Sequence, residues 1–269
     1  MTPLDGAALD YSGRAAVITG GTRGIGAGIA RAFLAAGAEV MVCGRSEPAA
    51  LPSVDGRAAR FVRADVRDPE QAGALIDAGV AAFGRLDVVV NNAGGGPPAA
   101  AATASPRLHA KIIELNLIAP LHVSQAANRV MQGQSGGGSI LMIGSVAGVR
   151  PAAGAAAYGA AKAGLQHLAT SLAMEWAPRV RVNTVVVGLM ATGEDDPHYG
   201  DEATRSALAA AVPLGRMAVP ADVAAACLYL ASPLAAYVTG AALTVHGGGE
   251  RAGYLALSAP PAQPASNAE

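Results

Sequence analysis

The sequence predicts an α/β fold, built as a doubly wound parallel sheet of seven strands with helices on both faces. Short runs of β-branched and other apolar residues alternate along the chain with Ala-rich stretches of helical length, which is the pattern of repeated βαβ units. These runs are predominantly apolar, as is typical of parallel strands covered on both faces. A chain of 269 residues can bury one large core without disulfides or metals, so we expect a single domain.

The strands follow from the short apolar runs. In chain order we expect them at Ala15–Thr19, Glu39–Cys43, Arg60–Ala64, Asp87–Asn91, Gly138–Gly144, Val180–Val187 and Ala242–Val245. The helices between them are expected at Gly24–Ala36, Pro69–Phe83, Ser105–Gln132, Ala157–Trp176 and Pro220–Ala231. In the last two helices Ala, Leu and Met recur at i, i+3 and i+4, so each presents an apolar face to the sheet.

Two segments depart from this alternation. Gly193–Pro213 contains an acidic stretch before a short Ala-rich helix, and we expect it to form a lid over the site. Glu250–Glu269 is rich in Ala, Pro and Ser, which favours a poorly ordered tail. The domain is therefore expected over residues 1–249 and the tail over residues 250–269.

Composition and charge exclude several classes of partner. Lys and Arg number 19 against 20 Asp and Glu, and no Lys/Arg cluster of five or more occurs, so we expect neither nucleic acid nor a membrane as partner. Small molecules and other protein chains remain. Charged residues make up only 14% of the chain, which indicates that some apolar surface meets another subunit.

The N-terminal residues and the two cysteines indicate a reducing compartment. The chain starts without a basic residue before Arg14 or an apolar segment typical of signal peptides. Cys43 and Cys227 lie in apolar contexts with no second Cys or His at metal-ligand spacing, so we expect buried reduced thiols and no metal site. A cytoplasmic location is expected.

A glycine-rich loop directly after the first expected strand is the strongest candidate binding site. It consists of Gly20, Gly21, Thr22, Arg23, Gly24, Ile25 and Gly26. Glycines there permit a tight turn and the close approach of a pyrophosphate, which binds free amides and the positive end of the following helix. A flexible turn is the alternative, but this loop joins a buried strand to an Ala-rich helix. The loop therefore predicts a Rossmann-like dinucleotide site.

The end of the second strand indicates which dinucleotide binds. A carboxylate about 20 residues past the loop would bind the adenosine ribose hydroxyls of NAD. Here the strand is followed by Arg45, and Arg23 lies inside the loop. Guanidinium groups suit a 2′-phosphate, so NADP(H) is favoured, with NAD(H) left open. The alternative for Arg45 is a solvated loop arginine.

Further motifs follow the loop. They are Asn91-Asn92-Ala93-Gly94, Asn116 in ELNLIAP, Ser145 in GSVAG, Tyr158 with Lys162, and a late stretch that begins PLGRMAVPAD. In this order they resemble the short-chain dehydrogenase/reductase family, small single-domain type, over about residues 10–249, and are similar to 3-oxoacyl-carrier-protein reductases. The loop's glycine spacing resembles the reductases rather than the sugar-nucleotide epimerases. The four-residue step from Tyr158 to Lys162 argues against the divergent enoyl reductases.

The chemistry of these residues can also be argued directly. Tyr158 and Lys162 are four residues apart on an expected helix, so they share a face. An ammonium about 4 Å from the phenol contributes ~4 kcal/mol at an effective dielectric of ~20, enough to lower its pKa by roughly three units. Tyr158 then becomes a usable proton carrier. Ser145 ends the fifth strand, where its hydroxyl can orient a substrate carbonyl, although a lone Ser there is more often a cap or turn residue.

The resemblance implies roles for other residues. Asn116 would hold a water that relays protons through Lys162, which would also contact the nicotinamide ribose; a locally bonded helix residue is the alternative for Asn116. The further cofactor contacts that it implies are Asp65 and Val66 at the adenine, Asn92, Ala93 and Gly94 along the ribose, and Gly188, Met190 and Thr192 at the nicotinamide. Most relatives have Pro-Gly after the sixth strand, where this chain has Val187-Gly188, so the preset φ of proline is lost there.

The sequence thus predicts an oxidoreductase that moves hydride between NADP(H) and a carbonyl or secondary alcohol, of ketone or 3-oxoacyl type, with Tyr158 as general acid/base. One alternative is an NAD-dependent alcohol dehydrogenase of the same fold. Another is a non-catalytic regulator that senses a dinucleotide, and the presence of both Tyr158 and Lys162 argues against it. Because family members pair through their long helices, we expect a homotetramer.

Overall fold

The structure, a computed structural model of the chain, describes residues 9–191 and 200–250. Several expectations lie outside these residues: the contact at Thr192, most of the acidic part of the lid, and the tail beyond Glu250. Both cysteines are free and buried, as expected. In the described part, no helix has the length and apolar character needed to span a membrane.

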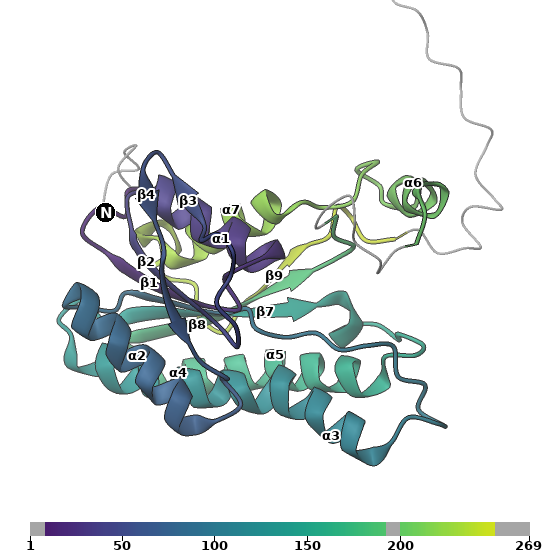
Figure 1. The fold of residues 1–269 in the computed structure, drawn as a ribbon, viewed down its shortest axis with the longest axis horizontal. Coiled ribbons are helices and arrows are strands. Elements are labelled where there is room, and N and C mark those ends of the chain that lie inside the picture. The colour runs from purple at the N-terminus through teal and green to yellow at the C-terminus, as the bar shows by residue number, and fades with distance from the viewer. Residues whose placement is uncertain (1–8, 192–199, 251–269) are drawn as a thin grey trace, which may run out of the picture.

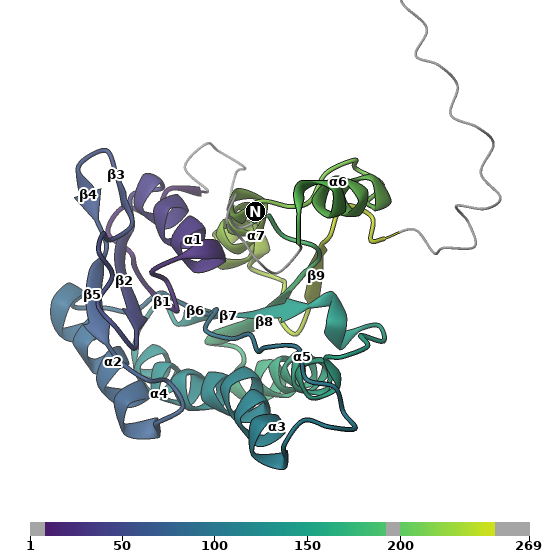
Figure 2. The ribbon, with the colours of Figure 1, turned by 45° about the vertical axis from the view of Figure 1, so that its right-hand side comes forward.

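Two layers of helices cover one sheet (Figure 1). On one face lie α1 (Gly24–Ala35) and α7 (Pro220–Ala231). On the other lie α2 (Pro69–Phe83), α4 (Ala119–Gly133) and α5 (Ala156–Trp176), as Figure 2 shows with the sheet between the layers. The expected doubly wound α/β fold is confirmed.

The sheet contains seven strands in the order β5-β2-β1-β6-β7-β8-β9, all paired in parallel. Their bounds are β1 (Ala15–Thr19), β2 (Glu39–Gly44), β5 (Arg60–Arg63), β6 (Val88–Asn91), β7 (Gly138–Ser145), β8 (Val180–Val187) and β9 (Ala242–Val245). Along the chain, the sheet starts with β1 in its interior, continues through β2 to β5 at one edge, and then resumes with β6 on the other side of β1. Ligands bind at such a reversal, outside the carboxyl ends of the strands.

The apolar strands are explained by burial on both faces. Successive side chains of a strand point to opposite sides of the sheet. Accordingly, Ile18 packs with Phe33 of α1 on one face, whereas its neighbour Val17 packs with Leu75 of α2 on the other. Every residue of β1 is buried. The central strands therefore provide a rigid platform for the loops at their ends.

A small hairpin was missed by the sequence analysis. β3 (Ser53–Val54) and β4 (Arg57–Ala58) pair antiparallel across a turn at Asp55 and Gly56. Both turn residues have positive φ, 50° and 78°, the geometry that an Asp-Gly pair favours in a two-residue hairpin. The Asp-Gly signal was present in the sequence, but the flanking strands are only two residues long.

The sequence predicts one continuous helix over Ser105–Gln132, and this prediction was wrong in the middle of the range. Ser105 is instead the cap of α3 (Pro106–Ile113), where its hydroxyl accepts a hydrogen bond from the Leu108 amide. A π-helical turn, Glu114–Ile118, then separates α3 from α4. Such turns insert one extra residue into a helix and occur often at functional sites. The turn here carries Asn116.

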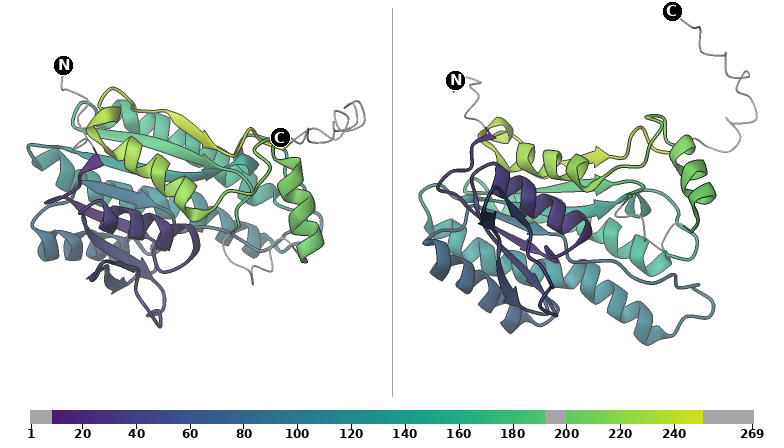
Figure 3. Two further views of the ribbon diagram at one scale, coloured as in Figure 1. Left: turned by 90° about the horizontal axis from the view of Figure 1, so that it is seen from above. Right: turned by 45° about the horizontal axis from the view of Figure 1, so that its top comes forward.

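The Ala-rich helix expected near the lid is α6 (Glu202–Ala211). Asp201 caps it by accepting a hydrogen bond from the Thr204 amide at 2.9 Å. None of its residues is buried. Figure 3 shows α6 at one end of the molecule, apart from the helices that cover the sheet.

Candidate active site

The carboxyl ends of the parallel strands border one large cavity of about 1540 Å³. The glycine loop after β1, Arg45 after β2 and the residues after β5 lie along one part of it. The residues after β6, β7 and β8 line the other part, together with Tyr158 and Lys162 of α5. The cavity is therefore long enough to bring most of the sequence-predicted residues to a single ligand.

The glycine loop leaves the first turn of α1 open to the cavity. Arg23 is the N-cap residue, and its side chain makes no capping hydrogen bond. Gly20 and Gly24 have φ values of 61° and 51°, in the left-handed region that glycine adopts without strain. A Cβ on Gly26 would lie 2.4 Å from the Gly20 carbonyl oxygen. The loop thus folds tightly against α1 and presents free amides, which suits a diphosphate.

Two loop-associated residues have a supporting position. Gly21 does not line the cavity; it packs on β2, where a Cβ would lie 2.5 Å from Val42. The Asn92 amide donates to the carbonyls of Thr19 and Gly20, at 3.0 and 3.1 Å. Asn92 therefore fastens the glycine loop to the end of β6, and it also lines the cavity.

Lys162 is a buried cation. Only 5% of it is exposed, and its ammonium donates to the Ile143 carbonyl at 2.7 Å. Its Nζ lies 5.7 Å from the centre of the Tyr158 ring. Burial lowers the pKa of Lys162 from its usual 10.5 to about 8. The helix spacing thus brings both side chains to the cavity wall, as the sequence predicts.

Two glycines let the turn that follows Ser145 pack closely against α5, the helix of Tyr158 and Lys162. Gly148, in the short 3₁₀ turn after β7, would place a Cβ 2.8 Å from the backbone of Lys162. Gly159 would place one 2.7 Å from the Ala147 carbonyl oxygen. The Ser145 hydroxyl accepts from the Ala147 amide at 3.2 Å, so it caps the turn and faces the cavity as well.

Asn116 is fully buried, and its side-chain amide forms hydrogen bonds with backbone groups. Its Nδ2 donates to the carbonyls of Gly95 and Ile112, and its Oδ1 accepts from the Gly95 amide at 2.8 Å. The bond to Ile112 is the local bonding that the sequence left open as an alternative. A Cβ on Gly94 would lie 2.8 Å from Asn116 Oδ1 and 3.2 Å from Lys162 Nζ. Asn116 therefore holds the chain after β6 beside Lys162.

At the predicted nicotinamide end of the site, residues at the carboxyl ends of β8 and β9 contact each other. Val187, which stands where most relatives have proline, pairs with Val245 and extends β8. A Cβ on Gly188 would lie 2.6 Å from that of His246, so this position requires glycine. Met190 is buried, lines the cavity and forms a bridge to Ala218.

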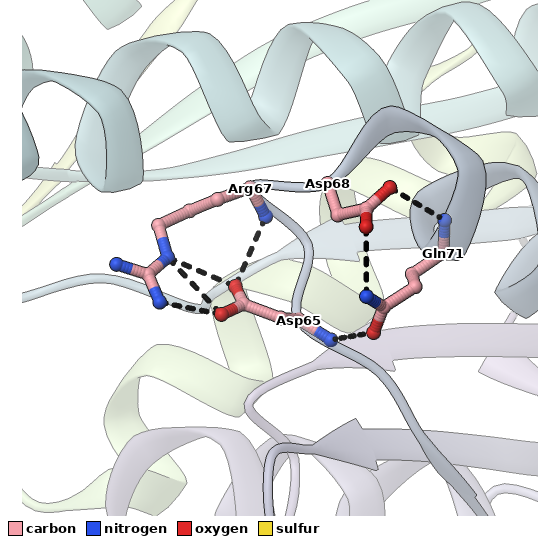
Figure 4. Close-up of polar contacts among 4 residues, drawn as sticks. All are labelled: Asp65, Arg67, Asp68 and Gln71. Atoms are coloured by element: carbon pink, nitrogen blue, oxygen red, sulfur yellow. Dashed lines mark hydrogen bonds and ion pairs between the residues drawn. The ribbon is translucent and has the colours of Figure 1, made fainter.

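An ion pair dominates the opposite end, after β5. The Arg67 guanidinium donates to both oxygens of Asp65, through Nε at 3.0 and 3.2 Å and also through Nη2 (Figure 4). These bonds hold the pKa of Asp65 below its usual range. Gln71 accepts from the Asp65 amide and donates to Asp68. Arg45, exposed, lies on the same wall.

Comparison with known proteins places the chain in a family. A family model described as "Enoyl-(Acyl carrier protein) reductase" matches residues 20–250. The chain belongs to the short-chain dehydrogenase/reductase family. It is 41% identical over 240 residues to an uncharacterized oxidoreductase of Mycobacterium tuberculosis, an alignment covering 87% of this chain and 91% of the relative. It is 37% identical over 243 residues to the 3-oxoacyl-[acyl-carrier-protein] reductase FabG of Vibrio cholerae, covering 89% and 98%.

A solved structure supports the same assignment. The NADPH-dependent 3-quinuclidinone reductase of Rhodotorula rubra superposes with a TM-score of 0.82 at 30% identity, covering 92% of this chain and 96% of that one. Short-chain dehydrogenases/reductases are enzymes that act on carbonyl or alcohol groups and bind a nicotinamide dinucleotide. The open helix end, the close-fitting glycines and the length of the cavity fit such a cofactor here.

The family positions come together in this structure with three exceptions. Gly21 packs on β2 behind the loop, Asn116 is fully buried and does not line the cavity, and Thr192 lies outside the described residues. Residues that line the cavity and were not singled out from the sequence include Arg67, Pro97 and Leu189. Arg67 follows Asp65 by two residues, a spacing that permits an ion pair, but only the turn after β5 shows that the pair forms. Among the described residues, no group of His, Cys, Asp or Glu is arranged to hold a metal.

Proposed function

We propose that this short-chain dehydrogenase/reductase transfers hydride between NADP(H) and a ketone or secondary alcohol, with Tyr158 as general acid/base. The observation that carries the proposal is the buried ammonium of Lys162 beside the Tyr158 ring, on a cavity wall that Ser145 also reaches. When bound, the nicotinamide supplies hydride to the substrate carbon or accepts it.

The protein groups then manage the substrate oxygen. In reduction, the Tyr158 hydroxyl gives its proton to the carbonyl oxygen; in oxidation, the phenolate takes the proton from the alcohol. Lys162 favours the phenolate because a positive charge in a buried site is poorly screened. Ser145 donates a hydrogen bond to the same oxygen and fixes its position. General acid/base catalysis of this kind contributes about 10²- to 10⁴-fold.

The cavity wall beside Ser145 supports an apolar substrate. Pro97, Pro98, Ala152, Ala153 and Leu189 line it. Small apolar side chains of this kind suit the body of a ketone or the acyl chain of a 3-oxoacyl group. By their names, the V. cholerae relative is a reductase of a 3-oxoacyl group and the R. rubra protein is a reductase of a ketone.

Arg45 and Arg23 support NADP(H) rather than NAD(H). Both are exposed and line the cavity, Arg45 directly after β2 and Arg23 at the start of α1. The residue directly after β2 is Arg45 and not a carboxylate that would accept hydrogen bonds from the ribose hydroxyls of NAD, although Glu47 lines the cavity two residues further on. Arg45 instead offers a partner for a 2′-phosphate.

The decisive test is Tyr158→Phe, assayed against a panel of ketones and 3-oxoacyl thioesters with NADPH. The variant loses the proton donor but little cofactor surface, so turnover should fall at least about 10³-fold while NADPH affinity stays within about twofold. Turnover retained in Tyr158→Phe would overturn the catalytic assignment. A wild type that binds NADPH but oxidises none with any carbonyl in the panel would favour the dinucleotide-sensing regulator.

We also propose that the chain forms a homotetramer. Apolar side chains stand exposed on the α4/α5 side of the molecule: Ile118 is 38% exposed and Met174 of α5 is 81% exposed. Burying such surfaces between copies would account for the low charge content of the chain. Light scattering at micromolar concentration should give four times the monomer mass, and a monomer would contradict the proposal.

A further inference from the structure

A second recess opens beside the cofactor cavity, at the end of the edge strand β5. It has a volume of about 380 Å³ and is lined by Arg45, Arg63, Asp65, Arg67 and Gln71. Arg45, Asp65 and Arg67 also line the large cavity, so the recess continues it. Three guanidinium groups and one carboxylate give this recess a formal charge of about +2 at neutral pH.

Strand register explains why Arg63 faces this recess. β2 and β5 are parallel neighbours, and Gly44 pairs with Arg63 in the ladder. Arg45 directly follows Gly44, so the two arginines come from the carboxyl ends of adjacent strands. Both are exposed, and neither side chain forms a hydrogen bond or ion pair with another described residue. Two positive charges with open donors therefore lie on one wall.

The other polar side chains of the recess already have partners. Arg67 binds both oxygens of Asp65 and so neutralises the one carboxylate among the described residues that line the recess. The side-chain amide of Gln71 is engaged at both ends, with the Asp65 amide and with Asp68 (Figure 4). The charge left for an incoming ligand is that of Arg45 and Arg63. Such a pair attracts a compact, doubly charged anion.

We infer that Arg63, together with Arg45, binds the 2′-phosphate of NADP(H). The inference rests on the proposed function and adds a specificity-determining residue to it. A phosphate monoester carries about −1.5 to −2 charges at pH 7, which two guanidinium groups balance better than one. The sequence pattern of the glycine loop and β2 could not reveal Arg63, because it lies on the edge strand and meets Arg45 only through the ladder.

The experiment measures binding of adenosine monophosphates by calorimetry, which needs no substrate. The probes are 2′-AMP, 5′-AMP and inorganic phosphate, tested on wild type, Arg63→Ala and Arg31→Ala. Arg31 is an exposed residue of α1 that lines neither cavity, so its removal matches the change in charge. We expect Arg63→Ala to raise the Kd of 2′-AMP about tenfold and to change that of 5′-AMP less than twofold. Arg31→Ala should leave both unchanged.

Other outcomes are distinguishable. If wild type prefers 2′-AMP and Arg63→Ala keeps that preference, the role of Arg63 is overturned while the NADP(H) proposal stands. If wild type binds NADPH no more tightly than NADH, the NADP(H) preference fails as well. If inorganic phosphate binds the wild type as tightly as 2′-AMP, the recess is a free-phosphate site, and the assignment to the cofactor is wrong.

Discussion

The two ends of the large cavity differ in where their positive charges lie: at one end the charge is buried, and at the other the charges are exposed. At the end that we propose to be catalytic, Lys162 is buried and donates to a backbone carbonyl, with no carboxylate paired to it among the described residues. At the end that we expect to hold the adenosine, Arg45 and Arg63 are exposed, and an ion pair joins Arg67 to Asp65. Burial strengthens the electrostatic effect of Lys162 on its neighbours and shifts its pKa, but it lowers the stability of the fold. The exposed charges of Arg45 and Arg63 cost the fold little stability, but dissolved salt screens them.

The largest effect expected from this contrast is that of Lys162→Ala. Removing the buried ammonium leaves Tyr158 with no cation to favour its phenolate, and it would also delete the contact with the nicotinamide ribose that the family resemblance implies. We expect kcat to fall about 10³-fold and the Kd of NADPH to rise. Steady-state kinetics and calorimetry measure the two effects separately. A loss of NADPH affinity with unchanged kcat would show that the buried charge serves binding alone.

The second prediction concerns stability and pH. The pKa of Lys162 is about 8 in the folded protein and near 10.5 when unfolded, so unfolding takes up a proton between these values. The destabilisation by burial is complete below pH 8 and disappears as the pH rises to 10.5. The stability contributed by this site should therefore increase by about 3 kcal/mol over that range. Urea unfolding of wild type and Lys162→Met at pH 7.5 and pH 10 measures it. A constant difference between the two proteins would contradict the lowered pKa.

The third prediction tests the exposed end. Arg45→Asp places a carboxylate where the 2′-phosphate is expected, and the carboxylate can accept bonds from ribose hydroxyls instead. The ratio of kcat/KM for NADPH to that for NADH should fall about ten- to a hundredfold. The same ratio in wild type should also fall with added salt, unlike kcat. A wild type that uses NADH as well as NADPH would return Arg45 to a solvated loop residue.

The smallest effect is expected for Arg23→Ala. Arg23 is exposed at the start of α1, and the uncapped amides of that helix remain when its side chain is removed. NADPH affinity should therefore weaken less than about fivefold. Arg31→Ala, on the same helix, is the matched control, and calorimetry is the measurement. A loss larger than that of Arg45→Asp would place the phosphate nearer to the loop than to β2.

The sequence predicted most elements because their determinants are local. α2 begins at Pro69 with Asp68 as its cap, and the central strands β1, β6 and β7 are short, mostly buried apolar runs. The π-helical turn could not be predicted, since Glu114–Ile118 continues the helical pattern and its position depends on the bonds of Asn116 to Gly95. Tertiary contacts decide it.

The site shows the same division. Tyr158 and Lys162 were predictable because helix geometry alone places them on one face. Arg63 was not, because its position depends on the register of β5 with β2. The supporting position of Gly21 depends likewise on Val42 of a neighbouring strand.

The tight contact at Gly26 has an evolutionary consequence. A side chain there would meet the carbonyl oxygen of Gly20, which belongs to the backbone, and no substitution elsewhere can shorten a backbone. At Gly138, by contrast, a Cβ would meet Met131, whose side chain a smaller residue could replace. A replaced Gly138 is thus open to rescue by a second mutation, whereas Gly26 has no such suppressor. Descendants of this chain that keep the loop must keep that glycine.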